Sequence, residues 1–255
     1  MTTQMHLAAQ YLAAAAISFL KKKENDSHMN LKFSVSDKNL TTHPLNTSGH
    51  TLSLNYQRFT LEWNSKNSKS SLRLHQTKHI EIVKWIQETA EEANILDPYV
   101  YKFHYQLPYP SIDDDYEFQL ESVDQLHRLA EHRVLAQQTL QAFLEQQQLT
   151  SKIRIWPHHF DTSAYAQLKN SPEFSIGLGL AIPDAYCNDY YFYLNGYQRG
   201  NKIATSSFNS ISKGKWLPAS FEGAVLPITG VAQDDGIAFF NEALKVYQHQ
   251  IHELK

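Results

Sequence analysis

The sequence predicts an α+β fold, in which a mainly antiparallel sheet is flanked by about four helices in a single domain, residues 1–255. Apolar residues recur at helical spacing in four segments. In other segments they alternate with polar residues, which is typical of strands with one covered face. We find neither an internal repeat nor a linker that would divide the chain. Because this length also allows two small domains, a boundary near residues 108–120 stays the alternative.

Composition and charge exclude several classes of partner. The net charge of −3 and the pI near 6.5 give no electrostatic footprint for nucleic acid, and no basic run is long enough to bind an anionic membrane. A single cysteine, Cys187, excludes an internal disulfide framework and a cysteine-based zinc cluster. It fits a reducing compartment, so we expect a cytoplasmic protein with no nucleic-acid or membrane partner. The sequence indicates no oligomeric state.

The apolar, alanine-rich segment Met5 to Leu20 predicts a packed helix. It lacks the basic residues that precede the apolar run of a signal peptide, since Lys21 to Lys23 follow the run. Polar residues also interrupt it, so it is too short and too polar to span a bilayer. The three lysines complement the helix dipole at its carboxyl end.

Residues 24–75 are predicted to form loops and strands. Glu24 to Leu31 is rich in turn-forming residues and leads into a short strand, Lys32 to Val35. Residues 50–75 alternate with a change of phase at Gln57-Arg58. Those two residues make a poor hairpin turn, which favours one long bulged strand. Asn64 to Ser71 is predicted as a loop before a return strand.

Two helices and an aromatic strand follow. Thr77 is predicted as the N-cap of a helix that runs to about Asn94. Tyr99 to Leu107 alternates aromatic with mostly polar residues and therefore predicts a strand. Consecutive carboxylates diverge and fit no calcium loop, so Asp113 to Asp115 is predicted as solvated loop rather than a cation site. Ser122 and Gln125 form a capping box for a helix that continues to about Gln148.

The last third of the chain predicts strands and a closing helix. Ser175 to Ile182 would place glycine and alanine on one face, which allows a close approach by a neighbour. A second strand, Asp189 to Asn195, would end at an Asn195-Gly196 turn. Trp216-Leu217-Pro218 and Ala224 to Pro227 are predicted as short edge strands. Asp234 or Asp235 would cap the final helix.

The densest cluster of reactive side chains lies at Ile153 to Tyr165. As a strand leading into a loop, it would place Trp156, His158 and Phe160 on one face and His159 and Asp161 on the other. Because large aromatic residues are usually buried, we expect His158 to be the more buried histidine and His159 to be available for chemistry.

Three hypotheses explain this cluster. In the first, His159 and Asp161 bind a divalent metal such as zinc, iron or manganese, with His28 as third ligand. In the second, Asp161 orients His159 as a general base without a metal. In the third, the motif is structural. No nucleophile can be named, because there is no G-x-S-x-G motif and Cys187 has no catalytic context. The predicted ligand-binding residues are His28, His158, His159, Asp161, Tyr191 and Tyr193.

Several motifs, spread over most of the chain, resemble an uncharacterised bacterial family, a domain of unknown function. They are D-S-H-x-N-L at Asp26 to Leu31, W-P-H-H-F-D at Trp156 to Asp161, S-I-G-L-G-L at Ser175 to Leu180, D-Y-Y-F-Y-L at Asp189 to Leu194 and A-V-L-P before a closing helix. The resemblance implies a soluble bacterial protein of one domain and no particular activity. Relatives with an aromatic-x-S-F-D segment replace His158-His159, which makes Phe160-Asp161 the steadier pair and disfavours a histidine metal site.

Two classes of function remain open on the sequence alone. One is an enzyme or a small-molecule binder whose pocket is lined by His28, His159 and Asp161. The other is a non-catalytic interaction or structural protein that uses its aromatic strands. A concave pocket where these segments meet would favour the first class, and a flat exposed aromatic patch would favour the second.

Overall fold

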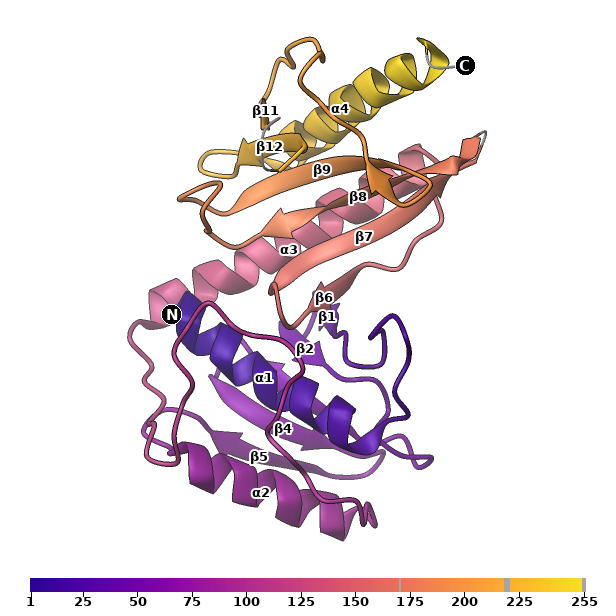
Figure 1. The fold of residues 1–255 in the computed structure, drawn as a ribbon. Helices are drawn as coiled ribbons and strands as arrows, with labels where there is room; N and C mark the ends of the chain where they lie inside the picture. Colours follow the sequence, from indigo (N-terminus) through magenta and orange to yellow (C-terminus); the bar gives the residue numbers. More distant parts are fainter. Residues whose placement is uncertain (170, 218–220, 254–255) are drawn as a thin grey trace. The chain divides into compact units, whose positions relative to one another are not determined.

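The computed structural model describes residues 1–169, 171–217 and 221–253 (Figure 1). The described chain is an α+β fold of four helices and two antiparallel sheets, which confirms the predicted class but shows two sheets rather than one. Two compact units are present: unit 1 is Met1–Val134 with Ile155–Phe160, and unit 2 is Leu135–Arg154 with Asp161–Lys255. The prediction of a single domain over residues 1–255 stays a prediction. None of the described helices combines the length and the apolar character that a membrane crossing requires.

Unit 1 consists of a five-stranded sheet with helices packed beside it (Figure 1). Its strands follow their sequence order, and each pairs with its neighbours in antiparallel fashion. A further helix, α3 (Val123–Gln146), begins in unit 1 and continues into unit 2. The other elements of unit 1 are α1 (Thr2–Phe19), β1 (Lys32–Ser34), β2 (Asn39–Thr41), β3 (Thr51–Asn55), β4 (Thr60–Asn64), β5 (Lys69–Arg73) and α2 (His79–Glu92).

The two faces of this sheet differ in chemistry. One apolar row crosses all five strands through Phe33, Leu40, Leu54, Leu61 and Leu72, as the register of the pairs requires. Helix α1 contacts the sheet at β3. Its residues from position 4 to position 16 are all buried, so its alanines serve close packing on several sides, and the prediction of a packed helix is confirmed.

The aromatic segment predicted as a strand is a loop that covers α1. Tyr99 donates its hydroxyl hydrogen to the carbonyl oxygen of Tyr11, and Tyr105 donates to the side chain of Gln10. The rings of Tyr101 and Tyr11 lie 4.9 Å apart. Alternation here reflects rings that pack on a helix rather than strand pairing, so the strand prediction was wrong.

A hairpin stands where the sequence favoured one bulged strand. The side-chain oxygen of Asn55 accepts hydrogen bonds from the backbone of Gln57 and Arg58, and Phe59 turns the chain with a φ of 52°. Strands β3 and β4 then pair directly. Strand β5 starts at Lys69, inside the predicted loop, and the N-cap of α2 is Lys78, one residue later than the predicted Thr77.

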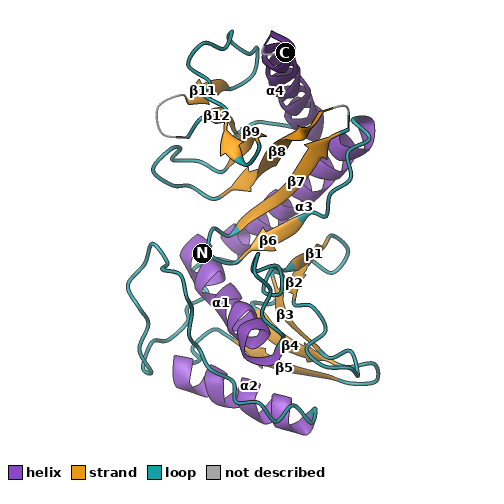
Figure 2. Cartoon of the chain, turned by 45° about the vertical axis from the view of Figure 1, so that its right-hand side comes forward, coloured by secondary structure: helices purple, strands orange, loops and turns teal. Residues whose placement is uncertain are grey.

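Unit 2 is built on the second sheet, which has seven strands (Figure 2). Within unit 2 the order is β11-β12-β9-β8-β7, with β10 paired to β9. Strand β6 (Arg154–Trp156) lies where the chain leaves unit 2. The remaining elements are β7 (Asp161–Leu168), β8 (Ser171–Ala181), β9 (Tyr191–Gln198), β10 (Asn201–Lys202), β11 (Lys215–Leu217), β12 (Gly223–Pro227) and α4 (Gln233–Glu253).

One face of the unit 2 sheet packs on helices. Leu178, Leu194 and Ala224 share a core with Phe143 of α3 and Phe240 of α4. The opposite face carries glycine on β8 and tyrosine on β9, as the cross-strand pair of Gly179 with Tyr193 shows.

Three further sequence predictions have different outcomes. The predicted Asn195-Gly196 turn is wrong, because Gly196 lies inside β9 against the ring of Tyr247 and the chain turns later, at Arg199-Gly200. Ser122 does accept the backbone N–H of Gln125, as predicted for its cap. Pro218, predicted beside Trp216-Leu217, lies outside the described residues.

Candidate functional site

The Trp156 to Phe160 segment is a turn. The carbonyl oxygen of Trp156 accepts hydrogen bonds from the backbone N–H groups of His159 (3.2 Å) and Phe160 (2.7 Å). Phe160 has a φ of 55°, in the left-handed region. The predicted alternation of faces is therefore wrong after Trp156, since a turn replaces the strand. His158 is half-buried and His159 is exposed, so the predicted order of burial is confirmed.

Polar side chains of unit 1 satisfy the backbone of this turn. The imidazole Nε2 of His6 and the amide of Gln10 both donate to the carbonyl oxygen of Pro157, at 2.7 and 2.9 Å. Arg133 donates to the carbonyl oxygen of Phe160 at 2.6 Å. Burial lowers the pKa of His6 to about 4, although the bond to Pro157 acts in the opposite direction. These contacts support the structural hypothesis for the motif.

The early polar segment makes contacts of its own within unit 1. Asp26 pairs with His104, with 2.9 Å between Oδ2 and Nε2. His28 is buried, and its Nδ1 accepts a long hydrogen bond of 3.4 Å from the backbone of Lys23. Burial lowers the pKa of His28, and the charge of Asp26 opposes that shift.

In unit 2 the structure brings Asp161 and Tyr193 together. The Tyr193 hydroxyl donates to Oδ2 of the buried Asp161. Burial raises the pKa of Tyr193 well above its usual range, and the charge of Asp161 adds to the shift. Tyr191 donates instead to Asp184, at 2.6 Å. The two tyrosines predicted to bind a ligand are thus neutral hydrogen-bond donors to carboxylates.

The predicted site residues are divided between the units. His28, His158 and His159 belong to unit 1, and Asp161 belongs to unit 2 with the two tyrosines. Among the residues that the structure describes, no group of three or more His, Cys, Asp or Glu side chains is placed to hold a metal ion. The metal and acid–base roles assigned to His159 and Asp161 stay hypotheses.

A pocket of about 560 Å³ opens in unit 1 at one end of β4 and β5. We call it the Arg58 pocket. It is lined by Arg58, Thr60, Ser71, Arg73, His75 and Leu120. Most of these side chains are hydrogen-bond donors, and a site with several donors is suited to a ligand rich in acceptors.

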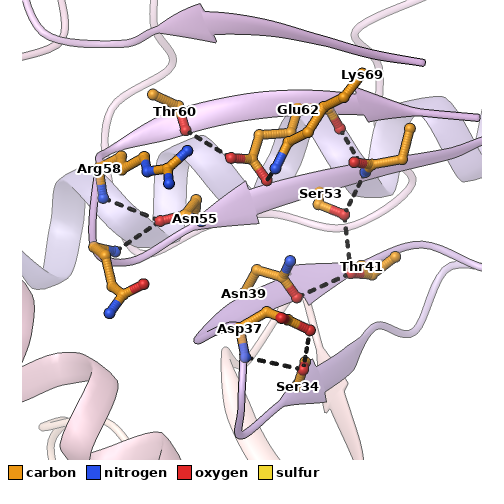
Figure 3. Close-up of polar contacts among 12 residues, drawn as sticks. Ser34, Asp37, Asn39, Thr41, Ser53, Asn55, Arg58, Thr60, Glu62 and Lys69 are labelled. Carbon is orange, nitrogen blue, oxygen red and sulfur yellow. Dashed lines mark hydrogen bonds and ion pairs between the residues drawn. The ribbon is translucent and has the colours of Figure 1, made fainter. Parts of the chain in front are cut away.

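Local structure presents Arg58 at this pocket. The residue after it, Phe59, is fully buried with its ring 6.3 Å from that of Phe118. This burial stabilises the left-handed conformation of Phe59, which costs roughly 1–2 kcal/mol in an L-residue. Figure 3 shows Arg58 beside Asn55 and Thr60 on the polar face of the sheet. The exposed guanidinium is therefore carried by a firmly anchored turn.

Arg73 and His75 reach the pocket from the end of β5. Arg73 is the cross-strand partner of Thr60, so both side chains lie on one face. His75 is two residues further on, and its Nδ1 accepts the backbone N–H of Leu120 at 3.1 Å. In a neutral imidazole this leaves the proton on Nε2, which makes His75 a hydrogen-bond donor there.

The two guanidinium groups are electrostatically unbalanced. With the other described residues, neither Arg58 nor Arg73 forms a side-chain hydrogen bond or an ion pair. A second pocket, of about 590 Å³ in unit 2, is lined by Arg199 and Lys202, and the Lys202 ammonium already donates to the carbonyl oxygen of Phe221 at 2.9 Å, so one guanidinium there, not two, is without a side-chain partner among the described residues. The Arg58 pocket thus combines two guanidinium groups that have no side-chain partner among the described residues with several further hydrogen-bond donors.

The chain was also compared with known proteins. No family model, curated protein or solved structure matches it. The resemblance to an uncharacterised bacterial family therefore stays a prediction, and the chemistry of the site rests on its own residues.

Sequence reasoning did not find the Arg58 pocket. The interpretation of Gln57-Arg58 as a bulge hid the hairpin, and without the hairpin Arg58 and Arg73 have no common location. One signal was present: Arg73 and His75 are two residues apart around the apolar Leu74, which places both on one side of an extended chain. The register of β4 with β5 was the missing information.

Proposed function

We propose that this chain binds a small anionic ligand, one that carries a phosphate or carboxylate group, in the Arg58 pocket. The observation that supports the proposal is the pair of uncommitted guanidinium groups, Arg58 and Arg73, beside the Nε2–H donor of His75. Guanidinium groups bind oxyanions through paired hydrogen bonds, and such charge-assisted bonds are stronger than neutral ones.

The proposed partner is a small molecule, as expected from the sequence, but the proposed binding site differs from the one predicted from the sequence. The earlier candidates His28, His159 and Asp161 retain their hypothetical roles in a separate metal or acid–base site. At the Arg58 pocket the lining residues include no carboxylate and no cysteine. We therefore assign binding to this pocket, not a catalysed reaction.

Thermal unfolding with added anions tests the proposal. A ligand that binds the native state at a hundredfold excess over Kd raises its stability by about 2.7 kcal/mol. Inorganic phosphate and citrate should raise the Tm of the wild-type protein above its value in sodium chloride of equal ionic strength. The variant Arg58→Gln/Arg73→Gln should lose this increase while it keeps the circular dichroism spectrum of the wild type.

The matched control is Arg128→Gln. Arg128 is an exposed arginine of α3, so its substitution removes the same charge away from the pocket. This control should keep the full increase in Tm. If phosphate and citrate act no better than chloride on the wild type, or if all three proteins respond equally, the chain is not an anion-binding protein of this kind.

A further inference from the structure

The Arg58 pocket continues into a sheet face made only of polar side chains. Thr60 and Arg73, which line the pocket, form one cross-strand pair, and the next pair on the same face is Glu62 with Ser71. Across β3 the face goes on with Ser53, the partner of Glu62. Figure 3 shows this face, with hydroxyl and amide groups around Glu62.

Glu62 is the acidic residue at the centre of this face. Its side chain is 1% exposed, although its neighbours on the same strand face are Thr60 and Asn64. The Nζ of Lys69 lies 2.7 Å from Oε2, and the Thr60 hydroxyl donates to Oε1 over 3.4 Å. The carboxylate is thus buried, paired with Lys69 and closed to a ligand.

The charges around the pocket fit a dianion. Lys69 and Glu62 form an ion pair and neutralise each other. The guanidinium groups of Arg58 and Arg73 remain, and they carry two positive charges. A phosphomonoester near neutral pH carries between one and two negative charges, with three oxygens that accept hydrogen bonds. Its phosphate therefore matches the pocket both in charge and in number of acceptors.

The hydroxyls of Ser71 and Thr60 supply a different chemistry beside the guanidinium groups. Each hydroxyl can both donate and accept a hydrogen bond. Groups of this kind pair with the hydroxyls of a ligand, which need both donors and acceptors. The neighbouring side chains on this face include no aromatic ring on which a base could stack.

We propose that the ligand is the phosphomonoester of a polyhydroxylated small molecule, such as a sugar phosphate. Its phosphate binds Arg58, Arg73 and the Nε2–H of His75, and its hydroxyl groups lie against the hydroxyls of Ser71 and Thr60. This inference rests on the proposed function, because it names the class of anion that the same pocket takes.

Titration calorimetry with four probes tests the inference: inorganic phosphate, glucose 6-phosphate, free glucose and succinate. We expect glucose 6-phosphate to bind at least about tenfold more tightly than inorganic phosphate, which corresponds to the gain from one or two added hydrogen bonds. Succinate should bind more weakly than phosphate, and free glucose should give no measurable heat. Arg58→Gln should weaken both phosphate compounds equally.

Two variants distinguish binding of the ligand's hydroxyl groups from binding of its phosphate. Ser71→Ala, at an exposed position, and Thr60→Val should narrow the difference in affinity between glucose 6-phosphate and inorganic phosphate, because each removes a hydroxyl that the sugar contacts. Because Ser71 is exposed, its variant keeps the test valid even where Thr60→Val fails to fold. Equal binding of the two phosphate compounds by the wild type overturns the sugar phosphate and leaves anion binding intact. Tighter binding of succinate overturns the phosphate, and no binding of any anion overturns the proposed function itself.

Discussion

The guanidinium carbon of Arg133 lies 4.3 Å from the centroid of the Phe160 ring, and Nη2 of Arg133 donates a 2.6 Å hydrogen bond to the carbonyl oxygen of Phe160. The same guanidinium donates through Nε to the Tyr56 hydroxyl, so one buried cation joins the end of β3 to the turn after β6. A buried charge is costly unless its donors are satisfied, and here they are used to fix a left-handed residue. Arg133 thereby holds the Ile155–Phe160 segment within unit 1.

Replacing Arg133 by methionine should destabilise the protein strongly. The substitution fills similar space but leaves the carbonyl oxygen of Phe160 and the hydroxyl of Tyr56 without this donor. We expect a loss of about 2–4 kcal/mol in the free energy of unfolding, because each unsatisfied buried group costs about 1–3 kcal/mol. Urea denaturation measures it. Arg128→Met, on the exposed side of the same helix, should change stability by no more than about 0.5 kcal/mol. A loss below 1 kcal/mol at Arg133 would contradict its anchoring role.

His6 should make stability depend on pH. Its pKa is about 4 in the folded chain, against an ordinary value of 6.5, because burial disfavours the imidazolium. The unfolded chain therefore binds more protons between these two values. The contribution of His6 to the free energy of unfolding is fully present above pH 6.5. It is lost as the pH falls toward 4, with a magnitude on the order of 3 kcal/mol.

The variant His6→Gln isolates this effect. Glutamine can still donate to the carbonyl oxygen of Pro157, yet it does not titrate. The slope of stability against pH between 4 and 6.5 should therefore become shallower than in the wild type, where other buried histidines such as His28 also contribute. His127→Gln, at an exposed position, serves as control and should keep the wild-type slope. Identical slopes for all three proteins would show that His6 is not held neutral by burial.

The two histidines of the central motif should respond differently to truncation. His158 is half-buried and its ring lies 5.5 Å from Tyr105 and 6.0 Å from Trp156, so His158→Ala should cost about 1 kcal/mol of stability. His159→Ala, at an exposed site, should cost less than about 0.5 kcal/mol. Metal analysis of the wild type and the His159 variant completes the experiment. Stoichiometric zinc, iron or manganese that disappears with His159→Ala would support the metal hypothesis, and metal-free wild-type protein would remove it.

On the glycine face of β8, an added methyl group should destabilise the protein more at Gly179 than at Gly177. A Cβ at Gly179 would lie 2.5 Å from the carbonyl oxygen of Thr162 and 2.9 Å from the Tyr193 ring, whereas at Gly177 its nearest neighbour would be the Tyr197 ring at 3.3 Å. Gly179→Ala should therefore cost about 1–3 kcal/mol, since backbone cannot move aside easily. Gly177→Ala should cost clearly less. Equal losses in urea denaturation would show that the two positions are equally packed.

Patterns that depend on local sequence predicted the fold well, and those that depend on distant partners did not. The alanine-rich Met5 to Leu20 segment and the Ser122 cap were recognisable because a helix satisfies its backbone locally. Tyr99 to Leu107 alternates like a strand, but its rings pack on α1, far away in the sequence. The Arg58 pocket depends on the register of two strands, and its arginines have no motif that marks them. His158 is more buried than His159, as predicted, although the strand faces on which that prediction rested are replaced by a turn.

A double-mutant cycle at Asp161 and Tyr193 should show strong coupling. Tyr193 donates to Oδ2 of Asp161, and among the described residues Oδ1 of this buried carboxylate has no hydrogen-bond partner. Tyr193→Phe leaves that charge without its donor, so we expect a loss of about 1.5–3 kcal/mol. Asp161→Asn should cost less, because the amide oxygen still accepts from Tyr193.

Once Asp161 is replaced by asparagine, the tyrosine substitution should cost much less than it does beside the carboxylate. Urea denaturation of the four proteins then gives a coupling energy of roughly 0.5–3 kcal/mol. Tyr197→Phe is the matched control, because the Tyr197 hydroxyl lies on the same sheet face without a hydrogen bond to another described residue, and it should change stability by at most about 0.5 kcal/mol. A coupling energy near zero would mean that groups other than Tyr193 stabilise the Asp161 charge. The hydrogen bond from Tyr193 would then not offset the free-energy cost of burying this carboxylate.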